Sequence, residues 1–262
     1  MKSIYECFNQ SYKDKKICAK LHHYLEIYDI LFKDIRDKKI NFLEIGVKLG
    51  GSISFWNEYF SNIKNFTGID IDPECKKFET DNTKILIGDQ ADINFLESVK
   101  EKIEDIDIIL DDGGHQFHQQ INSFEILFKK LKNDGIYIIE DTHSSYDNYS
   151  DIYPKDKVYN GGKNKEGTTV EFFKNLSDEV SAWSYIKEHG TCPLYQSKYE
   201  SWNDFLIKNN LSYQDIDYFR ENIFSITFFD SMIVIKKKTK KMPYVVFNDS
   251  IGKDFFYHDK KK

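Results

Sequence analysis

The sequence has 262 residues, 40% of them hydrophobic, which is enough for one α/β domain with additions or for a domain with a small lobe. Its formal net charge of -6 argues against a general nucleic-acid binder, because binding to phosphates needs a basic surface. Its four cysteines form no CxxC pair, so we expect neither a zinc ribbon nor a disulfide framework. No apolar run reaches the length of a membrane span, and the N-terminus MKSIYECFNQ lacks a signal-peptide stretch. We therefore expect a cytoplasmic protein.

Short apolar runs alternate with stretches of helical periodicity along the first 141 residues. The first forty residues are predicted to be helical, with apolar residues at helical spacing from Leu21 to Ile35. Strands are predicted at 41–46, 65–72, 83–89, 105–112 and 136–141. Helices are predicted between them, at 51–60, 92–103 and 121–131, the last ending near Asn133-Asp134-Gly135.

The alternating pattern ends after the fifth strand. Residues 144–168 have no period and are predicted to form a long loop over the site, followed by a helix at about 168–180. The segment NIFSITFFDSMIVIKK predicts two strands around a turn at Asp230 and Ser231. We therefore predict an N-terminal helical cap at 1–40 and a domain at 41–262, with a substrate-loop insertion at about 144–220.

This alternation predicts an α/β protein with a parallel sheet that helices cover on both faces. Such sheets bind ligands beyond the carboxyl ends of their strands. The five strands end in acids or glycines, which predicts a polar cluster along one sheet edge: Glu44 and Gly46, Asp70 and Asp72, Gly88 and Asp89, Asp111 and Asp112, and Glu140 and Asp141.

A cofactor site is predicted at the turn after the first strand, where LEIGVKLGGS resembles methyltransferase motif I. Gly46, Gly50 and Gly51 let the turn approach a ligand closely, and the amides at the start of the next helix suit a carboxylate. Glu44 suits an ammonium group, and Asp70 is placed for ribose hydroxyls. The glycine spacing is not GxGxxG, which disfavours NAD and favours S-adenosylmethionine. The predicted cofactor-binding residues are Glu44, Gly46, Gly50, Ser52, Asp70, Asp89, Gln90, Asp111 and Tyr24, with Asp89 and Gln90 beside the adenine and Tyr24 as a lid.

A metal site is predicted where the fourth and fifth strands end. Carboxylates that meet at one sheet edge repel each other unless a cation neutralises them, and oxygen ligands without cysteine favour Mg²⁺ or a similar ion. Asp112, Glu140 and Asp141 are the predicted ligands. The ion would hold a substrate hydroxyl and lower its pKa, and His115 would take the proton, which makes His115 and Asp112 the predicted catalytic residues. The same acids also fit helix caps or solvated turns, and His143 fits a ligand, a second base or a substrate contact.

Three segments together resemble the macrolide-sugar O-methyltransferases of mycinamicin and tylosin biosynthesis, and the rhamnosyl O-methyltransferase and cephalosporin-hydroxylase-like groups. They are DKKICAKLHHYLEIYDILF, DDGGH and IIEDTHSSY, within a match from about Asp14 to Tyr146 plus the terminal hairpin. The resemblance implies a Rossmann-like class I methyltransferase with seven strands in the order 3-2-1-4-5-7-6. It also implies Mg²⁺ on Asp112, Glu140 and Asp141, with His115 as the base.

The resemblance implies a sugar hydroxyl as acceptor. Residues 150–220 do not align with the antibiotic enzymes, and the Lys-rich, Arg-poor composition resembles an AT-rich bacterial coding bias. We therefore expect a nucleotide-activated or surface-polysaccharide sugar, as in capsule biosynthesis. Tyr146, Tyr149, Tyr153 and Tyr159 fit either stacking on a sugar or anchoring the loop.

Other functions compete with this prediction. They are methylation of a phosphoramidate or a catechol-like diol, a non-enzymatic nucleotide-binding module, and an iron-dependent oxygenase using Asp112, His115 and His143. We expect no nucleic-acid partner and, from the resemblance, a homo-oligomer.

Overall fold

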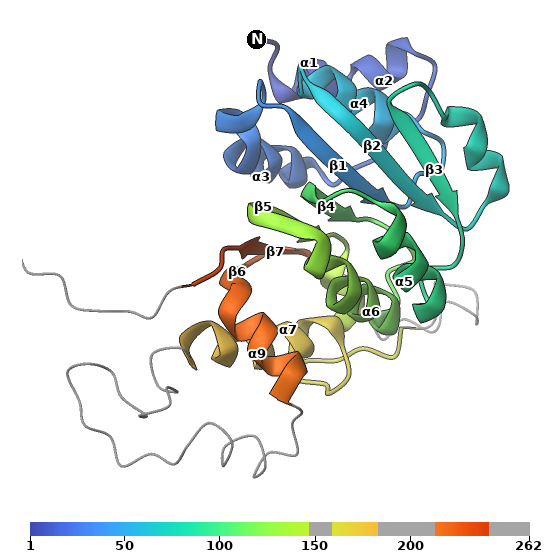
Figure 1. Ribbon diagram of the computed structural model, residues 1–262. Coiled ribbons are helices and arrows are strands. Elements are labelled where there is room, and N and C mark those ends of the chain that lie inside the picture. Colours follow the sequence, from blue (N-terminus) through green and yellow to red (C-terminus); the bar gives the residue numbers. More distant parts are fainter. Residues whose placement is uncertain (147–158, 183–212, 241–262) are drawn as a thin grey trace, which may run out of the picture. The chain divides into compact units, whose positions relative to one another are not determined.

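The computed structural model describes residues 1–146, 159–182 and 213–240. These residues form one sheet of seven strands in the order β3-β2-β1-β4-β5-β7-β6, which confirms the predicted topology (Figure 1). The strands are β1 (Ile40–Ile45), β2 (Ile63–Asp70), β3 (Thr83–Ile87), β4 (Ile106–Asp111), β5 (Leu131–Ile139), β6 (Ile223–Phe229) and β7 (Met232–Lys237). The first five are parallel, and β7 runs antiparallel to both β5 and β6.

Helices of the unit that contains the sheet cover both of its faces, as predicted. The α-helices are α1 (Ile4–Phe8), α2 (Gln10–Lys13), α3 (His22–Phe32), α4 (Gly51–Tyr59), α5 (Ile93–Lys102), α6 (Phe117–Leu127), α7 (Thr169–Ala182) and α9 (Tyr213–Asn222). Short 3₁₀ helices are η1 (Lys33–Ile35), η2 (Pro73–Phe78), η3 (Phe128–Lys130) and η4 (Thr142–Tyr146). On one face Phe42 of β1 lies 5.2 Å from Trp56 of α4, and on the other Tyr137 of β5 lies 5.4 Å from Phe124 of α6, between ring centroids.

The chain divides into two compact units. One consists of residues Met1–Ser177 and Ile223–Lys238, so the N-terminal helices fold with the sheet. The other consists of Asp178–Asn222 and Thr239–Lys262. The predicted cap at 1–40 and insertion at about 144–220 remain predictions about domain organisation. Within the described ranges, no helix combines the length and the apolar composition that crossing a bilayer requires.

Two predicted elements differ from the structure. The first forty residues are not helical throughout, because an irregular stretch at 16–21 joins α2 to α3. The helix that was expected to continue to Asn133-Asp134-Gly135 ends at Leu127, and these three residues lie within β5. A turn at these residues is consistent with the φ of 64° at Asp134. The helix was predicted too long because Phe128 and Leu131 are buried at helical spacing, although neither belongs to the α-helix.

Candidate active site

A cleft of about 590 Å³ lies at the carboxyl ends of the strands. It is lined by residues that follow β1 to β4 and by the start of α6, together with Tyr159. A second cavity of about 310 Å³ shares Gly46, Asp112 and His115 with it and extends to Asp141. Its remaining wall includes Ile17–Lys20, from the irregular stretch before α3. Most of the predicted site residues therefore gather at one edge of the sheet.

The glycine turn after β1 is held by strand β2. Gly46 and Gly50 have φ angles of 93° and 70°, which favour glycine. Asp70 Oδ2 accepts hydrogen bonds from the amides of Val47 and Lys48, both at 2.8 Å. Asp70, the predicted ribose ligand, thus lines the cleft and also fixes the path of the turn.

The Gly46→Ala variant should be strongly destabilised. A Cβ at Gly46 would overlap the backbone carbonyl oxygen of Asp112, which cannot move without displacing β4. The positive φ alone should cost about 1–3 kcal/mol of unfolding free energy, measurable by urea denaturation. Gly162→Ala is the control, because a Cβ there meets only Lys165 side-chain carbons at 3.6 Å. Equal stability of the two variants would contradict this account of the turn.

Glu44 is buried beneath this turn. Ser52 Oγ donates to Glu44 Oε2 at 2.7 Å, while among the described residues the other oxygen, Oε1, has no hydrogen-bond partner. Burial raises the pKa of Glu44 to about 7, against the lowering effect of Lys20. A buried carboxylate oxygen without a partner fits the ammonium group of an amino acid ligand, directly or through water.

Gln90 and Asp111 form a buried pair beside the cleft. The Gln90 amide donates to both oxygens of Asp111 at 2.8 Å and accepts from the Gly114 amide at 3.1 Å. Gln90 and Asp89 line the cleft, whereas Asp111 is fully buried and does not. Burial raises the pKa of Asp111 to about 7. Asp111 therefore positions Gln90, and its predicted role in cofactor binding stays a prediction.

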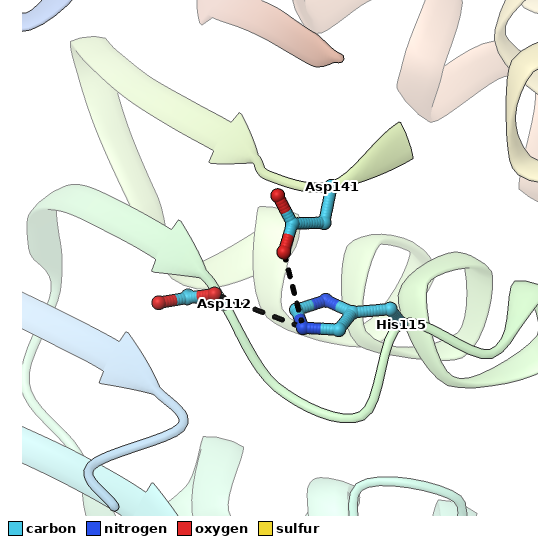
Figure 2. A group of neighbouring side chains, drawn as sticks. All are labelled: Asp112, His115 and Asp141. Atoms are coloured by element: carbon cyan, nitrogen blue, oxygen red, sulfur yellow. Dashed lines mark ion pairs between the residues drawn. The ribbon is translucent and has the colours of Figure 1, made fainter. Parts of the chain in front are cut away.

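Asp112, His115 and Asp141 converge at the ends of β4 and β5 (Figure 2). His115 Nε2 lies 3.8 Å from Asp112 Oδ1 and 3.5 Å from Asp141 Oδ2, and one donor atom from each residue lies within 4.8 Å of the others. His115 and Asp141 have φ angles of 58° and 54°. Left-handed backbone at two facing side chains is typical of functional sites, where strain is tolerated for positioning.

Burial dominates the electrostatics of His115. It lowers the pKa of the imidazole, although the carboxylates of Asp112 and Asp141 act in the opposite direction. His115 Nδ1 is buried and has no partner among the described residues. A neutral imidazole with Nε2 directed at two carboxylates can accept a proton or donate a lone pair to a metal ion.

Glu140 is not one of the three residues whose ligand atoms converge, and it is held by two other side chains. Its carboxylate receives Lys20 Nζ at 2.8 and 3.0 Å and the hydroxyl of Tyr28. Lys20 Nζ also lies 2.5 Å from Asp112 Oδ2. Burial acts to lower the pKa of Lys20, but the carboxylates outweigh it and the pKa is raised; burial also raises that of Glu140. Of the predicted metal ligands, Asp112 and Asp141 are together, and Glu140 joins them through Lys20.

Tyr24 supports Asp141. Its hydroxyl lies 2.9 Å from both Asp141 Oδ1 and the Ser231 carbonyl oxygen, and it accepts from the Asp141 amide at 3.1 Å. Tyr24 is buried and does not line the two cavities, so its place over the cofactor stays a prediction.

Two residues that hold Glu140, Lys20 and Tyr28, were not predicted from the sequence. Tyr28 shares a helical face with Tyr24, which was an available signal. Lys20 lies within the segment DKKICAKLHHYLEIYDILF, which resembles the family, but no role was predicted for this lysine.

Two of the four tyrosines predicted to stack on a sugar or to anchor the loop lie within the described residues. Tyr159 lines the cleft, with its ring 6.5 Å from that of Phe117. Tyr146 is exposed. Tyr149 and Tyr153 lie outside the described residues. His143 is also exposed, with Nδ1 3.9 Å from Asp141 Oδ1, at the margin of the site.

No family model matches the chain. The chain is 29% identical over 178 residues to the 8-demethyl-8-alpha-L-rhamnosyl tetracenomycin-C 2'-O-methyltransferase of Streptomyces olivaceus, covering 65% of this chain and 44% of the relative. It is 30% identical over 184 residues to the mycinamicin VI 2''-O-methyltransferase of Micromonospora griseorubida, covering 67% and 44%. The chain thus spans less than half the length of these curated relatives.

Among solved structures, the MycE methyltransferase from the mycinamycin biosynthetic pathway, in complex with Mg and SAH, is similar over 94% of this chain and 57% of MycE. The TM-score is 0.68 at 22% sequence identity. With the observed strand order, this likeness defines the class of the protein, which has the class I methyltransferase fold. Within that class, its homologues are the sugar O-methyltransferases named above, in agreement with the resemblance of the sequence motifs.

Proposed function

We propose that this protein is an S-adenosylmethionine-dependent O-methyltransferase that uses a divalent ion to methylate a sugar hydroxyl. The convergence of Asp112, His115 and Asp141 beside the glycine turn carries the proposal. The curated relative from Streptomyces olivaceus supports the sugar as acceptor, because its name describes O-methylation of a rhamnosyl tetracenomycin.

The residues present fit both groups. Glu44, with its partnerless oxygen, suits the ammonium group of the methionine moiety, and Asp70, Asp89 and Gln90 line the cleft that would receive the nucleoside. The carboxylates of Asp112 and Asp141 supply the hard oxygen donors that Mg²⁺ prefers. When bound, such an ion holds the acceptor oxygen and lowers the pKa of its hydroxyl.

His115 has the role of general base. In the transfer, the hydroxyl proton would pass to the His115 imidazole, and bound S-adenosylmethionine would supply the methyl group, with the electron pair of the broken carbon–sulfur bond left on sulfur. The products are a methyl ether and S-adenosylhomocysteine. Burial keeps the imidazole neutral at pH 7, since its pKa lies below the ordinary value. Asp112 and Asp141 then stabilise the imidazolium after proton transfer.

The finer proposal is a nucleotide-activated or surface-polysaccharide sugar. It is supported by the Lys-rich, Arg-poor composition, which resembles an AT-rich bacterial coding bias. Formation of S-adenosylhomocysteine should be measured with nucleotide-activated sugars, oligosaccharides, rhamnosyl polyketide glycosides, phosphoramidates and a catechol, each with Mg²⁺ and with excess EDTA.

The expected result is turnover on one class of sugar that EDTA abolishes. Turnover on a polyketide glycoside alone would replace the finer proposal and preserve the reaction class. Turnover that is indifferent to EDTA would reject the metal, and activity confined to the catechol or the phosphoramidate would reject the sugar.

A further inference from the structure

Lys20 occupies a position between two predicted metal ligands. Its side chain is only 2% exposed, and Nζ contacts Asp112 Oδ2 at 2.5 Å and both oxygens of Glu140 at 2.8 and 3.0 Å. The two acids come from neighbouring parallel strands, so this one ammonium group links the ends of β4 and β5. Glu140 has the Tyr28 hydroxyl as a further donor.

The negative charge of the carboxylates at the ends of β4 and β5 explains why a cation is needed there. Lys20 Nζ bridges Asp112 and Glu140, Asp141 converges with Asp112, and Glu140 is almost completely buried. Buried carboxylates without compensation are strongly destabilising, so Lys20 stabilises the edge in the absence of other cations. Lys20 neutralises one charge, and a divalent ion would neutralise two.

An ammonium group and a divalent ion cannot share these oxygens. An ion on Asp112 Oδ2 and Glu140 would lie within about 2–3 Å of those oxygens, where Lys20 Nζ now lies. Two cations at such a separation repel strongly in a site of low dielectric constant. Lys20 also affects His115. While Lys20 holds Glu140, the imidazole would be the third ligand beside Asp112 and Asp141; once Lys20 releases Glu140, that carboxylate could take the place of the imidazole.

The segment carrying Lys20 forms part of a cavity wall. Ile17–Lys20 line the cavity of about 310 Å³ that reaches Asp112, His115 and Asp141. The segment is pressed against the start of α4, because a Cβ on Gly51 would overlap the carbonyl group of Ile17. Movement of Lys20 away from the carboxylates therefore changes this wall of the cavity.

We propose that Lys20 is a displaceable counter-ion: a divalent ion binds to Asp112 and Glu140 only when the Lys20 ammonium withdraws, which frees His115 for proton transfer and loosens the 16–21 segment. This inference rests on the metal site of the proposed function. Lys20 acts as a positioning residue, because it acts through the ligands and not on the substrate.

Mn²⁺ binding by the full chain, measured by titration calorimetry without S-adenosylmethionine or acceptor, tests this directly. The Lys20→Met variant should bind Mn²⁺ at least about tenfold more tightly than the unaltered chain, a typical size for coupling between two ligands. Lys16→Met is the matched control and should bind as the unaltered chain does, since Lys16 Nζ lies instead 5.6 Å from the Phe78 ring centroid. Equal or weaker binding by Lys20→Met would overturn the inference while leaving the metal site intact. Absence of binding by every variant would overturn both.

A second measurement uses the unaltered chain and does not depend on the folding of a variant. Acylation of lysine amines, followed by mass spectrometry, should find Lys20 protected without metal and several-fold more reactive with saturating Mn²⁺. Lys64, which lies on β2 outside the 16–21 segment, serves as the internal reference, with constant reactivity. Protection of Lys20 that persists at saturating Mn²⁺ would show that the ammonium remains in place and would reject its displacement.

Discussion

The His115→Asn variant should lose methyl transfer by about 10²–10⁴-fold, the usual contribution of a general base. Asparagine is chosen because it tolerates the left-handed backbone of position 115, where φ is 58°. It cannot accept a proton at neutral pH, so the step that forms the methyl ether slows. Affinity for S-adenosylmethionine should change little, because the His115 imidazole lies against Asp112 and Asp141 (Figure 2).

The measurements are single-turnover rates and calorimetric binding of S-adenosylmethionine. His118→Asn is the matched control, since His118 is exposed three residues further along the chain. It should retain the full rate. If His115→Asn also retained the full rate, proton removal would have to be assigned to another group, and the metal alone would be sufficient to activate the hydroxyl.

The second large effect is expected for Asp141→Asn. The change removes one negative charge from the edge while asparagine accommodates the φ of 54° and can still bond to the Tyr24 hydroxyl. We expect Mn²⁺ affinity to fall by about 10–100-fold or more, as losses at metal sites do, and the methyl transfer rate to fall with it. Calorimetry and S-adenosylhomocysteine formation at increasing Mn²⁺ give the two values.

Asp134→Asn provides an equivalent control elsewhere in the molecule. Asp134 also has a left-handed backbone, with a φ of 64°, but its carboxylate is exposed and lies 3.7 Å from Lys238 Nζ. The same substitution should leave metal binding and activity unchanged there. An Asp141→Asn protein that binds Mn²⁺ as tightly as the unaltered chain would remove Asp141 from the ligand set.

Much of the sheet could be predicted because strands buried on both faces are continuous apolar runs. The run NFLEI became β1, and the paired apolar runs around Asp230-Ser231 became the β6–β7 hairpin. Position along the strand also predicted the carboxylate edge, because Asp112 and Asp141 lie one and two residues after the ends of β4 and β5, and parallel strands bring these ends together. The confirmed strand order came from the family resemblance, since periodicity alone does not specify which strands are neighbours.

The partners of the carboxylates could not be predicted in the same way. Lys20 lies 92 residues from Asp112 and 120 from Glu140, and it stands in a segment that periodicity assigned to a helix. No composition or spacing distinguishes this lysine from the surface lysines around it. The helix end at Leu127 was missed for a related reason, because Phe128 and Leu131 are buried as the helical period predicts but belong to η3 and β5.

The origin of Lys20, ahead of the first strand, also affects biosynthesis of the chain. Synthesis proceeds from the N-terminus, so Lys20 has left the ribosome well before Asp112 and Glu140 are made. When β4 and β5 are synthesised, the nascent chain therefore already contains Lys20, the lysine that neutralises the carboxylates at their ends. A circular permutant beginning at β1 would reverse this order, and its acidic strand ends would emerge before the lysine that neutralises them.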